Sequence, residues 1–139
     1  MAENIALQQQ RTDKVAPVVI GLLELKRLTK DPGFKYDQNS NTFSYQGQEN
    51  TIIYDGKKLQ LIDNKSNQPK MIAENQNPTG NPQWSAINLP VNCSGLSQQD
   101  ENKFANPEFV HKVKQAIKEA RQQTQQNSST NQKTKAISR

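Results

Sequence analysis

The feature that most constrains the fold is a run of short strands and turns from Phe34 to Glu74. Thr42–Tyr45 and Leu59–Leu61 alternate apolar and polar residues, which is the period of a half-buried strand. Turns rich in Asn, Asp and Gly separate such segments, and Asp55-Gly56 is a strong hairpin signal. The pattern predicts an antiparallel meander, with Gln83–Ile87 as a candidate for a last edge strand.

One long helix is predicted on each side of the meander. Val15–Leu28 places apolar residues at helical spacing and Pro17 fits a first turn, which predicts a helix over 15–29 with any helix upstream kinked or separate. Asn106-Pro107-Glu108 supplies a cap, a proline at the first position and an acid in the first turn, and predicts a helix over about 107–124. We expect its apolar stripe to pack on the protein's own sheet; the alternative is that a partner helix covers it.

These elements predict an α+β fold, an antiparallel β-meander of about four or five strands flanked by an N-terminal and a C-terminal helix. Only 32% of the 139 residues are hydrophobic, so the core must be small. The expected organisation is a polar N-terminal segment at 1–12, one small α+β domain at 13–124 and a disordered basic tail at 125–139. The tail holds too few apolar residues to pack.

Positive charge is concentrated at the C-terminal end of the chain. The net charge is +5, and Lys103–Arg139 contains eight Lys or Arg against two Glu. The preceding residues are close to neutral, with ten Lys or Arg against eleven acids. A basic terminal arm attracts polyanions such as nucleic acid, anionic lipid or an acidic protein surface. The alternative is a solvated face that only keeps the protein soluble.

Side chains for catalysis and metal binding are scarce. His111 is the only histidine and Cys93 the only cysteine, and neither lies in a recognisable catalytic motif. A structural zinc site needs about four Cys or His ligands, more than the chain contains. Carboxylates such as Asp55 and Asp63 fall at predicted turns, which are exposed, whereas acid–base catalysis needs a sheltered cleft. We therefore expect no enzymatic activity, no catalytic, metal or cofactor site, and no small-molecule substrate.

Nothing in the sequence predicts a membrane segment. The apolar run Val15–Leu25 covers eleven residues, which is too short to span a bilayer. Met1–Gln10 lacks the positively charged region with which a secretory signal begins. We expect a cytoplasmic protein that does not associate with membranes.

The segregated positive charge favours a small module that contacts nucleic acid non-specifically through its C-terminal helix and tail. Such binding weakens steeply as salt rises, because each phosphate contact releases counterions. The hypothesis assigns phosphate contacts to seven residues: Lys112, Lys114, Lys118, Arg121, Lys133, Lys135 and Arg139.

Protein interaction is the alternative function. The edge near Trp84, an open sheet face carrying Tyr45 and Tyr54, or the helix at 15–29 would then bind a protein partner or form a homodimer. Aromatic residues on an open face also stack on single-stranded bases. The competing interpretation places the aromatic face in the core beneath the two helices. Trp84 is expected to be partly exposed, because it lies beside Pro82 on an edge strand.

Overall fold

The computed structural model describes residues 2–77, 79–90 and 93–137, with their side chains between residues 6 and 123. Helices and strands follow one another as the sequence predicts, and the α+β class is confirmed. The elements are α1 (Ala2–Leu28), β1 (Phe34–Asp37), β2 (Thr42–Gln46), β3 (Asn50–Tyr54), β4 (Lys58–Asp63), β5 (Gln68–Asn75), β6 (Trp84–Ala86), α2 (Gln98–Phe104) and α3 (Pro107–Ile137).

The six strands form one antiparallel sheet in the order β1-β2-β3-β4-β5-β6, which is a simple meander. Local turn chemistry fixes it: Asn41 and Asn67 adopt positive φ angles of 53° and 58°, and Gly56 one of 96°. At the β3–β4 turn the Asp55 carboxylate accepts hydrogen bonds from the backbone of residues 57 and 58. The sheet has six strands, and not four or five, because the candidate edge segment pairs with β5.

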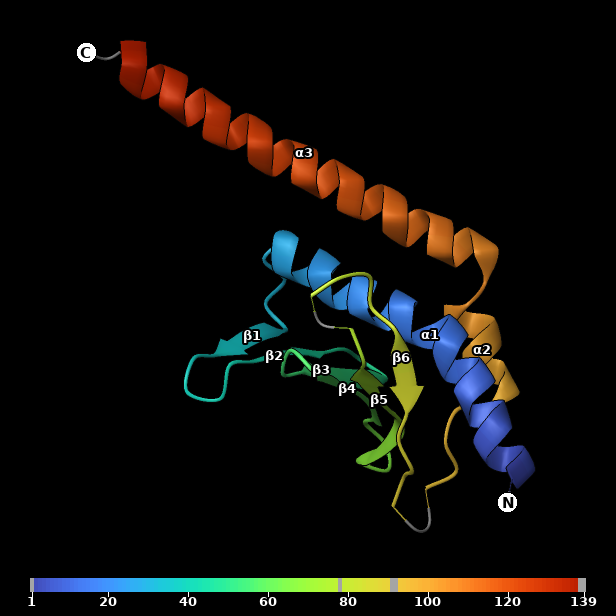
Figure 1. Ribbon diagram of the computed structural model, residues 1–139. Helices are drawn as coiled ribbons and strands as arrows, with labels where there is room; N and C mark the ends of the chain where they lie inside the picture. The colour runs from blue at the N-terminus through green and yellow to red at the C-terminus, as the bar shows by residue number, and fades with distance from the viewer. Residues whose placement is uncertain (1, 78, 91–92, 138–139) are drawn as a thin grey trace.

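The core lies between one face of the sheet and α1. Strand register places Ile52 opposite Leu61, and Leu61 opposite Met71. These side chains pack with Val15 and Val19 of α1 into one buried cluster. Figure 1 shows three layers, with α1 between the sheet and α3. Within the part of the chain that the structure describes, no helix covers the opposite face of the sheet.

α1 begins much earlier than the sequence predicts. It runs as one helix from Ala2, with Pro17 in its interior, so the expected start at residue 15 is wrong. Pro17 lies on the exposed side of α1. Its ring removes the helical hydrogen bond to the carbonyl of Asp13, a residue that is also exposed. Contacts made by residues 8–12 hold the first half of the helix in place.

α3 packs on α1 and not on the sheet, so the expectation for its apolar stripe is wrong. A Cβ built on Gly21 of α1 would lie 3.5 Å from Val113 Cγ1 and 3.6 Å from Ile117 Cδ1. Both are ordinary van der Waals distances, so Gly21 lies directly against α3 where the two helices pack together. The physical reason for the misprediction is that α1 already occupies the apolar face of the sheet.

The C-terminal end of α3 also differs from expectation. The helix continues to Ile137, whereas the sequence predicts an end near residue 124. Figure 1 shows this second half extending past the end of α1, away from the sheet. The side chains after residue 123 lie outside the described residues, and the disordered tail at 125–139 stays a prediction.

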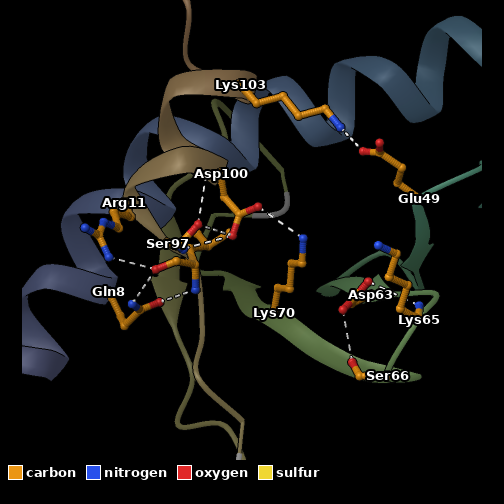
Figure 2. A network of polar contacts seen from close by, with 11 residues as sticks. Gln8, Arg11, Glu49, Asp63, Lys65, Ser66, Lys70, Ser97, Asp100 and Lys103 are labelled. Atoms are coloured by element: carbon orange, nitrogen blue, oxygen red, sulfur yellow. Dashed lines mark hydrogen bonds and ion pairs between the residues drawn. The ribbon is translucent and has the colours of Figure 1, made fainter.

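Two glutamines join α1 to distant backbone. The Gln9 amide donates to the Trp84 carbonyl at 3.0 Å and accepts from the Ala86 N–H at 2.8 Å, as a neighbouring strand would. The Gln8 amide does the same at Leu96, donating and accepting at 2.9 Å (Figure 2). The outer edge of β6 is therefore closed to further strands.

We expect Gln9→Ala to lower the free energy of unfolding by about 1–3 kcal/mol, because it leaves partly buried backbone groups of β6 without partners. Urea denaturation followed by circular dichroism measures the change. Gln10→Ala is the matched control, since Gln10 is exposed and makes no side-chain hydrogen bond among the described residues. Equal effects of the two substitutions would contradict the role of Gln9.

A polar network holds α2 against the sheet (Figure 2). Ser97 and Asp100 form a capping box at the start of α2, and Lys70 of β5 lies 3.1 Å from the Asp100 carboxylate. Burial acts to raise the pKa of Asp100, but hydrogen bonds from Ser97 and Lys70 outweigh it and hold the pKa below its usual value. Lys103 of α2 pairs with Glu49 beside β3. These charged contacts join α2 to the sheet, beside the buried Phe104 of the same helix.

Candidate nucleic-acid interface

Three predicted lysines lie on the outward side of α3. Val113 and Ala120 are buried against the rest of the protein, so the opposite side of the helix faces solvent. A turn of 100° per residue places Lys114 and Lys118 on one flank of that side and Lys112 on the other. All three are exposed. α3 thus holds cations along both flanks of one rigid surface.

These lysines differ from Arg121 in their electrostatic partners. Among the described residues, no ion pair or side-chain hydrogen bond involves Lys112, Lys114 or Lys118. Arg121 instead lies 3.3 Å from the Glu24 carboxylate of α1, which Arg27 contacts at 2.8 Å. Hydrogen bonds from Arg27 first, and then from Arg121, hold the pKa of Glu24 below its ordinary value. Glu24 is therefore ionised at neutral pH and gives Arg121 an ion-pair partner that the three lysines lack among the described residues.

The side chains of the remaining predicted basic residues lie outside the described part of the structure. Lys133 and Lys135 belong to the helical backbone of α3, but their side chains are outside the described residues. Arg139 lies wholly outside them. Their contribution to phosphate binding stays a prediction.

The predicted aromatic interaction residues belong to the core side of the sheet. Trp84 is only 8% exposed and packs edge-on against Tyr54 with ring centroids 6.0 Å apart, so the expected partial exposure is wrong. Tyr45 opposes the buried Ile52 and lies beneath the ammonium group of Lys26 at 5.1 Å. The competing interpretation, an aromatic face packed under a helix, is the one that the structure supports. The alternation of side chains along the strands could have predicted this burial, because all three rings share the face of the buried aliphatic residues.

The other surfaces predicted for protein interaction are covered to different extents. The helix predicted at 15–29 packs between the sheet and α3 but keeps Pro17 exposed, and Gln9 closes the edge of β6. The uncovered face of the sheet carries the cross-strand row Ser44, Ile53, Gln60 and Ile72, which mixes polar and apolar side chains.

The two nucleophile or base candidates lie in different parts of the fold. The Cys93 thiol contacts the Gln68 amide at 3.7 Å in the connection before α2, whereas His111 is exposed on α3. Among the described residues, no group of three or more His, Cys, Asp or Glu is arranged to hold a metal ion. None of the described helices combines the length and apolar character that crossing a membrane requires.

Sequence reasoning missed an apolar groove along the seam between α1 and α3. It was missed because the sequence predicts α3 on the sheet, where no such seam exists. The groove has a volume of about 390 Å³ and adjoins a basic hollow of about 430 Å³ that shares Lys114 and Ile117 with it. The groove is lined by Lys14, Pro17, Val18, Gly21, Ala105, Val110, Val113, Lys114 and Ile117.

No protein family matches the chain, and neither the curated proteins nor the solved structures provide a match. Its function is therefore inferred from its own surface chemistry.

Proposed function

We propose that the protein is a non-enzymatic, cytoplasmic module that contacts nucleic acid through the outward side of α3. The observation that carries this proposal is the set of three exposed lysines on that helix, Lys112, Lys114 and Lys118, which have no ion-pair partner among the described residues. An unpaired ammonium group gains a phosphate contact without losing a carboxylate contact first. Arg121 contributes less, because it already contacts the Glu24 carboxylate.

The same arrangement favours binding without base recognition. Lysine is a flexible point charge that fits phosphate oxygens but does not read base edges by itself. The aromatic rings that would stack on unpaired bases are packed against the core. Affinity should therefore follow charge density, and double-stranded DNA should bind more tightly than single-stranded DNA of equal length.

Fluorescence anisotropy with labelled single- and double-stranded DNA tests the proposal. Three lysine contacts predict a slope of about −2.7 in log affinity against log salt on duplex DNA. Affinity for the duplex should then fall about 40-fold when salt is raised from about 50 to about 200 mM. Absence of binding at the lower salt, or binding that ignores salt, would contradict the proposal.

The apolar groove favours a second candidate, recognition of a protein. Its lining is apolar except at Lys14 and Lys114, so it offers few groups for phosphate contacts. A groove of this composition between two helices is typical of sites that receive an amphipathic helix.

A further inference from the structure

We infer that the groove between α1 and α3 docks an amphipathic helix of a partner protein whose apolar stripe is bordered by acidic residues. Figure 1 shows α3 crossing over α1. The groove is lined by residues of both helices and lies along this seam. The inference does not rest on nucleic-acid binding, since the groove floor contains none of the phosphate-binding lysines except Lys114.

The floor of the groove is apolar and incompletely filled. Gly21 contributes no side chain, and the nearest atoms of Val113 and Ile117 lie 3.5 and 3.6 Å from the position of its absent Cβ. Pro17 is exposed and Val110 is half-buried at the same surface. These side chains form the kind of shallow trough in which residues at positions i, i+3, i+4 and i+7 of a helix are buried.

The charges around the groove determine whether an acidic or a basic helix can bind there. Lys114 borders the apolar floor, and Lys118 and Arg121 border the adjoining hollow. No carboxylate lines either part among the described residues, and the nearby Glu24 is already bonded to two arginines. A helix with carboxylates beside its apolar stripe would complement this rim, whereas a basic helix would be repelled.

The length of the groove also suits a helix. The lining residues that belong to α3, in the groove and in the adjoining hollow, extend from Val110 to Gln122. At 1.5 Å per residue this distance is about 18 Å, which matches an amphipathic helix of about three turns. Because Lys114 and Lys118 serve both surfaces, an acidic helix and nucleic acid are expected to compete.

The direct test uses a fluorescein-labelled peptide of about 18 residues, with leucines at helical spacing and glutamates at the flanking positions. We expect it to bind the full chain at least ten-fold more tightly than two controls. One control replaces each glutamate with lysine, and the other has the same composition with the leucines dispersed. Equal affinity for all three peptides would overturn the inference, and so would the absence of binding.

Protein variants locate the site. Lys114→Glu with Lys118→Glu should weaken the acidic peptide at least ten-fold, whereas Lys35→Glu with Lys58→Glu, the same charge change on the sheet, should not. Pro17→Glu should weaken binding of the acidic peptide, whereas Pro17→Lys should not. Position 17 is exposed and helical, so both substitutions should be tolerated by the fold. Equal losses in the groove and sheet variants would also overturn the inference.

The failure of this inference is separable from the failure of the proposed function. Peptide binding is measured without nucleic acid, and DNA binding without peptide. Lys112→Glu changes a lysine on the opposite flank of α3, so it should weaken DNA binding and leave peptide binding within about two-fold.

Discussion

Leu61→Ala is expected to lower the free energy of unfolding by about 3 kcal/mol. Leu61 is fully buried in β4, between Ile52 of β3 and Met71 of β5, on the face that α1 covers. Truncation removes apolar contacts and leaves a cavity that rigid neighbours fill only in part. Trp84 is the only tryptophan and is buried, so its fluorescence during urea denaturation reports the change.

Ile53→Ala is the matched control for this substitution. Ile53 lies on the adjacent strand β3 but faces the uncovered side of the sheet, where it is only half-buried. Ile53→Ala should lower the free energy of unfolding by less than half as much as Leu61→Ala, because less apolar area returns to water. Equal losses would mean that the second face is also covered, which would contradict a single core beneath α1.

Replacing Lys112, Lys114 and Lys118 together with glutamine is expected to reduce affinity for duplex DNA on the order of 10³-fold at about 50 mM salt. The three ammonium groups are the exposed, unpaired cations of α3 among its described side chains. Glutamine keeps helix propensity and a polar side chain while removing the charge. Fluorescence anisotropy gives the affinities, and circular dichroism checks that the fold is retained.

A triple variant of the sheet lysines provides the control. Lys35, Lys58 and Lys65 are also exposed and form no ion pair among the described residues. Their replacement with glutamine removes the same net charge from another surface. Affinity should then fall by far less than for the α3 variant. A similar loss in both variants would show that net charge, and not the α3 surface, governs binding.

The sheet could be predicted from sequence because its determinants are local. Asn41, Gly56 and Asn67 bring the chain into turns on their own, and alternation in β2 and β4 assigns each side chain to a face. The same alternation places Tyr45 and Tyr54 with the core. Trp84 was misjudged because neighbouring Pro82 indicated an edge, whereas the helix covering that edge is a tertiary feature.

The helix arrangement could not be predicted, because it depends on contacts between distant parts of the chain. The apolar stripe of α3 was visible, but nothing local says whether it meets the sheet or another helix. In the sequence, the first half of α1 is polar and shows no packing partner. In the structure, Gln8 and Gln9 form hydrogen bonds with the backbone of Leu96 and β6. The groove between α1 and α3 exists only because these two helices pack together, so it could not be predicted from local sequence either.

The most direct test of the α3 surface is the slope of log affinity against log salt, measured on duplex DNA for the wild type and the triple α3 variant. The wild-type slope is expected to be steeper by about 2.7, because each lysine contributes about 0.9 through counterion release. The sheet variant should keep the wild-type slope. Identical slopes for the wild type and the α3 variant would contradict phosphate contact by Lys112, Lys114 and Lys118.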